Sequence, residues 1–164
     1  MRNFILLVIL FFASSVAHWG LASLFASFNI GVSFMFTVSM MVAMIYPKWS
    51  GYTFAFFGGL FLDFFGVNMF GAYALTFTLC VGIIYFLKRK MDFEVVLPQV
   101  VLIFLLSIAS ILIYNLAGIV FLKGIAWHGF KSLFLGSLIN AVVSPPVFYV
   151  LIVLRALSVT DRKN

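Results

Sequence analysis

The chain is 164 residues long, 65% of its residues are hydrophobic, and only 9% are charged. This composition excludes a soluble globular protein and predicts a single integral-membrane domain over residues 1–164. The formal net charge of +6 could suggest nucleic acid, but the basic residues are dispersed as membrane-edge anchors, so we expect no nucleic-acid partner. The single cysteine, Cys80, lies in an apolar run without a partner, which excludes a disulfide framework and a cysteine metal site.

Long apolar segments predict an all-α, polytopic membrane fold. We expect about six transmembrane helices, over residues 4–25, 31–46, 50–65, 69–87, 95–122 and 129–154. The first segment is longer than the usual core of a signal peptide and further spans follow it, so we interpret it as a retained helix. The second ends at Pro47, because proline ends a helix, and the Lys48-Trp49 pair that follows marks a membrane interface. The second and third segments are short for full spans and could be tilted or partly re-entrant.

Basic residues predict the orientation of these segments. Lys88, Arg89 and Lys90 form the densest basic cluster, directly after the fourth segment, and the positive-inside rule places their loop in the cytoplasm. With six crossings, both termini are then cytoplasmic, and only Lys123 and Lys131 fall on the outer side.

The stretch over residues 51–75, GYTFAFFGGLFLDFFGVNMFGAYAL, places a single carboxylate beside clustered glycines. On a helix, its small residues and Asp63 recur at steps of four and form one smooth face. A carboxylate at membrane depth costs about 2.5 kcal/mol or more on insertion scales, so Asp63 should point into the protein, toward a donor or a wet cavity. The predicted groove for a partner helix consists of Gly51, Ala55, Gly58, Gly59, Asp63 and Gly66.

Three polar residues lie toward the outer ends of outward-running segments. His18, Asp63 and Asn115 could therefore meet in one polar cluster, with Lys123 or Lys131 as a counter-charge for the carboxylate. Alternatively, Asp63 caps the turn at residues 66–68 or bonds to backbone groups at the helix end, and His18 is a satisfied interfacial histidine.

A fourth polar residue, Asn140, lies in the middle of the last segment, five residues before the tandem prolines Pro145 and Pro146. Two prolines remove two backbone donors, so we expect a kink and free carbonyl groups, for which Asn140 is a natural partner. Interhelical hydrogen bonding is the commoner role of such an asparagine, and lining a polar pore is the alternative.

Residues for chemistry are scarce in this sequence. No His, Glu or Asp grouping has metal-ligand spacing, no glycine-rich loop with Lys-Ser or Lys-Thr offers a phosphate cradle, and no Ser or Cys nucleophile has a base nearby. We therefore expect no catalytic residues, no metal, no cofactor and no enzymatic activity.

The stretch over residues 51–75 resembles the signature region of the MreD family of bacterial rod shape-determining membrane proteins. The resemblance rests on its glycine-started helix, on Gly58-Gly59-Leu60, on Asp63 and on the Gly66, Gly71 and Ala74-Leu75 that follow. The size of the chain, the Tyr46-Pro47 pair, the basic loop after the fourth segment, and Asn140 with Pro145-Pro146 agree with it.

The resemblance implies a six-helix bacterial inner-membrane protein, similar in architecture to the substrate-binding subunits of energy-coupling-factor vitamin transporters. It implies a non-enzymatic scaffold or assembly factor for cell elongation and peptidoglycan synthesis, which binds the membrane helix of an MreC-like single-span partner. RodA, penicillin-binding proteins and, indirectly, MreB filaments are further expected partners, besides membrane lipid. The alternative function is the substrate-binding subunit of a vitamin-type transporter, with His18, Asp63 and Asn115 as the solute site.

Overall fold

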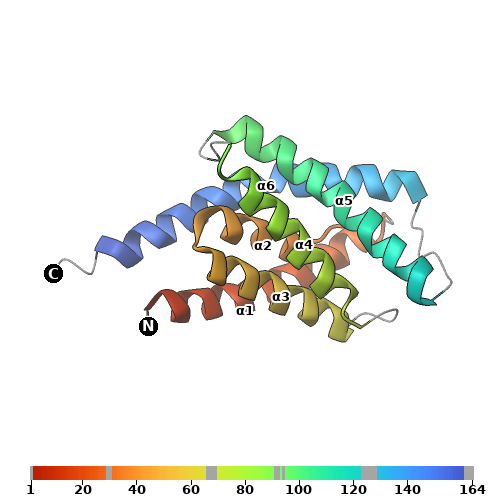
Figure 1. Cartoon of the computed structure of the whole chain (residues 1–164), viewed down its shortest axis with the longest axis horizontal. Coiled ribbons are helices and arrows are strands. Elements are labelled where there is room, and N and C mark those ends of the chain that lie inside the picture. Colours follow the sequence, from red (N-terminus) through yellow and green to blue (C-terminus); the bar gives the residue numbers. More distant parts are fainter. Residues whose placement is uncertain are drawn as a thin grey trace.

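The computed structural model describes residues 2–28, 31–65, 70–90, 93, 95–122 and 129–160, and this part of the chain is all-helical. The helices are α1 (Arg2–Ala26), α2 (Phe34–Ile45), α3 (Lys48–Phe65), α4 (Ala72–Leu87), α5 (Val96–Leu122) and α6 (Gly129–Thr160), which run side by side in a bundle (Figure 1). The predicted all-α class is confirmed, and each helix lies within a few residues of its predicted segment except at the end of α6, which extends to Thr160.

Helices α1, α5 and α6 are long and apolar enough to cross a membrane, over Phe4–Phe25, Val96–Val120 and Leu133–Ala156. Large apolar side chains on their outer faces, such as Phe12, Leu105 and Val142, are exposed, as is normal for surfaces that contact lipid tails. The protein is therefore a helical membrane protein.

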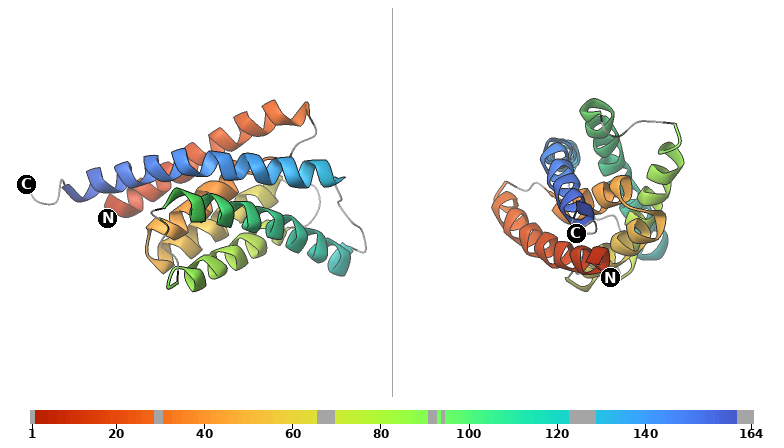
Figure 2. Two further views of the ribbon diagram at one scale, coloured as in Figure 1. Left: turned by 90° about the horizontal axis from the view of Figure 1, so that it is seen from above. Right: turned by 90° about the vertical axis from the view of Figure 1, so that its left-hand side faces the viewer.

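Helix α2 is the centre of the bundle (Figure 2). All of its residues from Met35 to Ile45 are buried, and α2 contacts every other helix, because its apolar side chains point in all directions. The side chain of Ser33 caps its start by accepting a hydrogen bond from the Phe36 N–H group at 3.3 Å. Since protein encloses α2, its length of about 18 Å need not match the thickness of the bilayer.

The C-terminal end of α2 receives two cationic side chains. Arg155 of α6 donates to the Ile45 carbonyl at 2.8 Å, and Lys88, just after α4, donates to the Ala43 carbonyl at 3.4 Å. The last carbonyl groups of a helix have no partner within the helix and carry partial negative charge, so cations stabilise them. Burial, and then the positive charge of Arg155, lower the pKa of Lys88.

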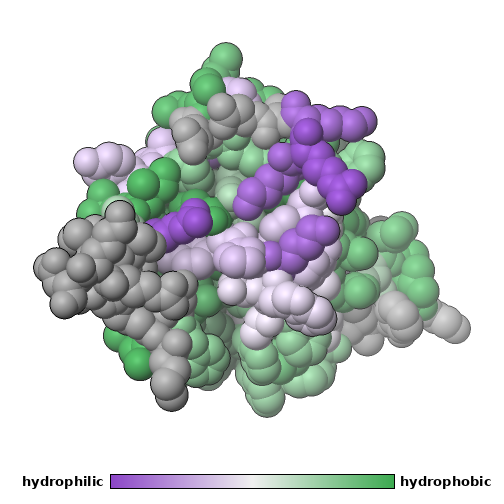
Figure 3. Space-filling model, turned by 60° about the vertical axis from the view of Figure 1, so that its left-hand side comes forward, coloured by the Kyte–Doolittle hydropathy of each residue, from purple (hydrophilic) through white to green (hydrophobic). Residues whose placement is uncertain are grey.

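These contacts gather the basic side chains at one end of the bundle. Figure 3 shows hydrophilic side chains on this end, which is also where the first residues of α3 and the basic cluster after α4 lie. It is the end for which the positive-inside rule predicts a cytoplasmic location.

Candidate functional site

Asp63, in the last turn of α3, is only 5% exposed and bonds to the first turn of α4. Its Oδ1 atom accepts a hydrogen bond from the Tyr73 N–H group and its Oδ2 atom one from the Ala74 N–H group, both at 3.0 Å. The first N–H groups of a helix need an acceptor, and Gly71, which precedes α4 with a φ of 91°, has no side chain to supply one. The predicted bonding of Asp63 to backbone groups at a helix end is confirmed, whereas the turn at residues 66–68 lies outside the described residues.

Gly59 lets α3 and α4 approach each other directly above this carboxylate. A Cβ atom at Gly59 would lie 2.5 Å from both the Cα and the backbone nitrogen of Ala74, closer than any side chain allows. The two backbones are therefore in direct contact, and the α3–α4 pair forms a tight antiparallel hairpin that Asp63 closes.

The other small residues of the same face pack against α2. A Cβ atom at Gly58 would lie 3.0 Å from the Cε atom of Met35, and one at Gly51 would lie 3.0 Å from the Cα atom of Ala43. Ala55, between them, is fully buried. The face predicted from the spacing is real, since all of its described members are buried.

The predicted occupant of this face is wrong. We expected a partner's helix to lie against Gly51, Ala55, Gly58, Gly59 and Asp63, but α2 and α4 of the same chain fill the groove. The physical reason is that small residues allow any helix to pack closely against them. Helices α2 and α4 directly precede and follow α3 in the chain, so short connections keep them next to this face. Gly66, Lys123 and the side chain of Lys131 lie outside the described residues, so the predicted counter-charge does too.

Asn140 bridges two long helices. Its Nδ2 group donates to the Oγ atom of Ser107 at 2.9 Å, which joins α6 to α5 in the buried interior. The predicted interhelical hydrogen bond is therefore confirmed.

One of the two carbonyl groups freed by the tandem prolines has a different partner from the one predicted. Pro145 cannot bond to the carbonyl of Ala141, four residues earlier, and the hydroxyl of Ser144 donates to that carbonyl instead, at 2.7 Å. We expected Asn140 in this role. Ser144 is better placed, because a serine hydroxyl reaches the preceding turn of its own helix whereas the amide of Asn140 points toward α5.

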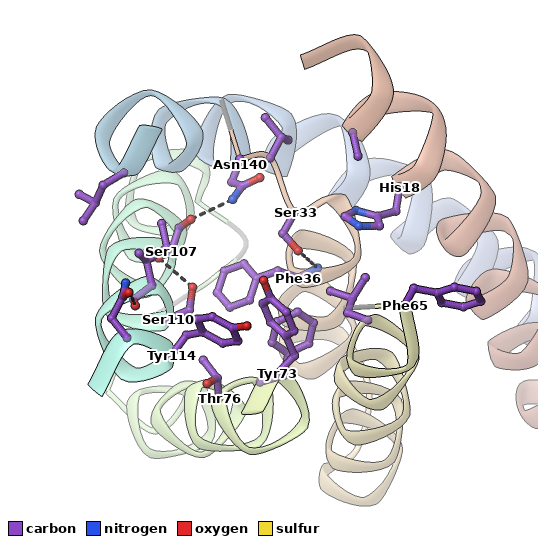
Figure 4. A pocket seen from close by; sticks show the side chains of 18 of the residues that line it. His18, Ser33, Phe36, Phe65, Tyr73, Thr76, Ser107, Ser110, Tyr114 and Asn140 are labelled. Atoms are coloured by element: carbon purple, nitrogen blue, oxygen red, sulfur yellow. Dashed lines mark hydrogen bonds between the residues drawn. The ribbon is translucent and has the colours of Figure 1, made fainter. Parts of the chain in front are cut away.

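A cavity of about 380 Å³ lies among the helices at the end opposite the basic cluster. All six helices or the residues just before them contribute to its lining (Figure 4). The polar side chains along it include His18, Ser33, Thr76, Ser107, Ser110 and Asn140, and the rings of Tyr73 and Tyr114 form one of its sides. Its volume lies in the range of small-molecule sites in proteins.

The predicted outer polar cluster is found in part. His18 of α1 and Asn115 of α5 line the same cavity, although they are far apart in sequence, and Asn140 joins them from α6. Asp63 is not among the lining residues, because both of its carboxylate oxygens bond to the start of α4. It reaches the cavity only indirectly, by holding the backbone from which Tyr73 projects.

Sequence reasoning missed the face of α5 that lines the cavity. Ser107, Ser110 and Tyr114 follow each other at steps of three and four, which places them on one side of a helix. Tyr114 stacks on Tyr73 with ring centroids 4.4 Å apart, so this side faces α4. The spacing of these polar residues within an apolar segment was the available signal.

Several polar atoms in this region are buried without a hydrogen-bond partner among the described residues. They are the Oδ1 atoms of Asn115 and Asn140 and the Nδ1 atom of His18. The orientation of the Asn115 amide is determined, because its Nδ2 group donates to the carbonyl of Ile111 at 2.8 Å and a carbonyl can only accept. The side chains of Asn115 and Asn140 are 7% and 4% exposed.

Ionic groups are absent from the described lining of the cavity, which contains no Asp, Glu, Lys or Arg. Within the described ranges there is also no group of three or more His, Cys, Asp or Glu residues that could hold a metal ion. The cavity offers hydrogen-bond acceptors, hydroxyl groups and aromatic surface, which suit binding of an uncharged molecule.

In the part of the chain that the structure describes, the fold and the cavity define an all-helical membrane protein with a small, partly open cavity whose mostly apolar lining carries several polar side chains. No protein-family model matches the chain, and no curated protein and no solved structure matches it either.

Proposed function

We propose that this protein is a non-enzymatic scaffold of the bacterial cell-elongation machinery, as its resemblance to the MreD family implies. In this proposal it crosses the inner membrane six times with both termini in the cytoplasm. It binds the membrane helix of an MreC-like protein and, through that partner, acts with RodA, penicillin-binding proteins and MreB filaments.

The observation that supports this proposal is the structural role of the residues in the stretch 51–75 that carry the resemblance. Asp63 caps α4, Gly59 lies on the backbone of Ala74, and Gly51 and Gly58 pack on α2. The residues that carry the resemblance thus hold a rigid hairpin against the central helix. A protein whose role is to present a fixed surface to a partner needs such rigidity, because a preorganised surface loses less conformational entropy on binding.

The partner helix then needs a surface other than the filled groove. We expect it to lie on the outer face of the α3–α4 hairpin, where the side chains of Phe57, Phe64, Leu75 and Leu79 are exposed. This face is held in shape by Asp63 and Gly59. An apolar single-span helix can pack on it within the bilayer by van der Waals contact.

The experiment is a site-specific photo-crosslinking scan in cells that express an MreC-like partner. The photoreactive residue replaces Phe57, Phe64, Leu75 or Leu79, and control positions on α5 and α6 are Leu112 and Val142. We expect crosslinks to the partner from the hairpin positions and none from the controls. Crosslinks from the controls alone would refute the proposed surface, while depletion that leaves rod-shaped cells unchanged would refute the function.

A second candidate function is the substrate-binding subunit of a small-solute transporter. The cavity lined by His18, Asn115 and Asn140 favours it, because such a subunit needs an interior site. Calorimetry of the purified protein with a panel of water-soluble vitamins tests this function. Tight binding of one vitamin supports this function, and the absence of a heat of binding for every vitamin in the panel contradicts it.

A further inference from the structure

We propose that the interior cavity is a specific site for an uncharged, largely aromatic molecule that carries N–H or O–H donors. The site goes beyond the scaffold function, since it requires neither a protein partner nor transport. It rests on three features of the cavity: unpaired acceptors, stacked rings and the absence of ionic groups from its described lining.

The unpaired acceptors specify donors on the ligand. The Oδ1 atoms of Asn115 and Asn140 are buried, and neither has a hydrogen-bond partner among the described residues. A buried carbonyl oxygen without a partner is costly, so a molecule that donates to it gains more than it would at an exposed site. Both residues line the cavity but their oxygens have almost no accessible surface, so a ligand donor reaches them after a small shift of the surrounding side chains. The Asn115 oxygen cannot exchange places with its nitrogen, because Ile111 holds the amide group.

The aromatic rings, and the lack of charged side chains among the described lining residues, indicate the shape and charge of the main part of the ligand. Tyr73 and Tyr114 stack almost in parallel, at 24°, and Figure 4 shows both rings along one side of the cavity, with Phe36 nearby. A flat ring system packs well against such a surface. The described lining contains no Asp, Glu, Lys or Arg side chain, so a charged molecule would be desolvated there without a counter-charge from these residues, and the proposed ligand is neutral.

The spacing of the lining residues indicates the length of the ligand. Ser107, which bonds to Asn140, and Asn115 are eight residues apart on α5, or about 12 Å along the helix axis. A bicyclic molecule therefore reaches one of the two asparagine oxygens, and a longer molecule with a donor at each end reaches both.

The test compares two probes of the same shape, indole and indene, of which only indole carries an N–H donor. Cys80 is the only cysteine of the chain and is fully buried, so a maleimide dye reacts with it only on unfolding. The midpoint of thermal unfolding of the purified protein in an uncharged detergent is measured against the concentration of each probe. Indene controls for partition of the probes into the micelle.

In the wild-type protein we expect indole to stabilise with an apparent Kd about tenfold lower than that of indene. The ratio should fall to about one in Asn115→Leu or Asn140→Leu, whichever oxygen the probe contacts. Ser23→Ala is the matched control, because the Ser23 hydroxyl bonds only within the exposed surface of α1, and it should keep the wild-type ratio.

A third variant, Ser110→Phe, keeps the test decisive if the asparagine variants do not fold. Ser110 lines the cavity, so the larger ring should occupy part of its space and abolish the effect of both probes. Equal stabilisation by indole and indene in the wild type, or a tenfold ratio that survives all three variants, would overturn the proposal.

The natural ligand could come from water or from lipid, and the two sources are distinguishable. Molecules retained by the purified wild-type protein and by Ser110→Phe are extracted and identified by mass spectrometry. A soluble ring compound and an uncharged membrane lipid with a ring headgroup each support the site when the wild-type protein alone retains them. Retention of charged phospholipid alone, with no discrimination between the probes, overturns it.

Discussion

At Asp63 both carboxylate oxygens are used, because each accepts one backbone N–H group from the start of α4. A buried carboxylate in a membrane segment usually indicates a functional site, but here its partners are structural. The charge is compensated by the two N–H groups and by the positive end of the helix dipole. At the scale of single residues, Asp63 of the signature stretch thus stabilises the fold.

We expect Asp63→Asn to lower the free energy of unfolding by about 1–3 kcal/mol, because an amide offers one acceptor where two N–H groups need one each. Asp63→Leu should cost more, since it leaves both N–H groups buried without a partner. The measurement is the midpoint of Cys80 labelling on heating or in denaturant. Thr53→Val, on the exposed side of the same helix, is the control, and an equal loss there would contradict the cap.

Gly59→Ala should also destabilise the protein, by about 1–3 kcal/mol, because the added methyl group collides with the backbone of Ala74 and forces α3 and α4 apart. Gly20→Ala is the matched control, since a Cβ atom at Gly20 meets nothing within 4 Å and alanine favours a helix. Equilibrium unfolding of the two variants checks this. An equal free energy of unfolding for the two variants would contradict the close contact between α3 and α4.

At the scale of the helices, α6 contains two prolines, and at Pro145 a side chain of the same helix replaces the lost backbone hydrogen bond. The hydroxyl of Ser144 donates to the Ala141 carbonyl, which Pro145 leaves free. The carbonyl of Ser144 in turn accepts from the side chain of Gln99 of α5 at 3.4 Å. The proline turn is therefore held by a side chain on each helix.

A double-mutant cycle tests this replacement. Ser144→Ala should cost about 1 kcal/mol in the wild-type background, because the Ala141 carbonyl loses its partner. In the Pro145→Ala background it should cost close to nothing, since the restored N–H group takes over the carbonyl. Unfolding of the four proteins is measured by Cys80 labelling, and additive effects would contradict the mechanism.

The end of α2 is bonded by cations from α6 and from the residue just after α4. We expect Arg155→Met to lower the free energy of unfolding by about 1–2 kcal/mol, because the Ile45 carbonyl loses a charged donor at 2.8 Å. Arg89→Met removes the same charge from the same end of the bundle, and both arginines are exposed, but among the described residues Arg89 has no hydrogen bond to α2. This control should leave stability almost unchanged, and equal losses would indicate a general effect of charge.

At the scale of the whole molecule, the basic residues gather at one end and the cavity lies at the other. The positive-inside rule then predicts that the cavity lies in the outer half of the membrane. A ligand from outside the cell or from the outer leaflet would have the shorter path to it.

Labelling of single cysteines in spheroplasts tests this orientation. In a Cys80→Ala background, Lys123→Cys should react with a membrane-impermeant maleimide added outside, and Lys90→Cys should react only after permeabilisation. The reason is that the positive-inside rule predicts a cytoplasmic location for the loop that carries the basic cluster after α4. The reverse pattern would invert the topology, and equal reactivity would contradict a single orientation.

The sequence by itself determined the helical class and, apart from the end of α6, the positions of the six helices that the structure describes, because long apolar runs can only satisfy their backbone groups in a membrane as helices. It also determined that the face with Gly59 and Asp63 is buried, since small residues and a carboxylate at steps of four must avoid lipid. These are local properties of the chain, so periodicity and composition suffice to predict them.

The tertiary structure alone decided which groups meet those residues. The acceptors and donors around Asp63, Asn140 and Ser144 come from packing of helices whose relative rotation no local pattern specifies. The cavity has the same origin, because residues from six separate segments of the chain, His18 and Asn115 among them, line it together. Periodicity predicts the face that a helix buries, but the choice between the chain's own helix and a partner's helix depends on the packing energy of the assembled bundle.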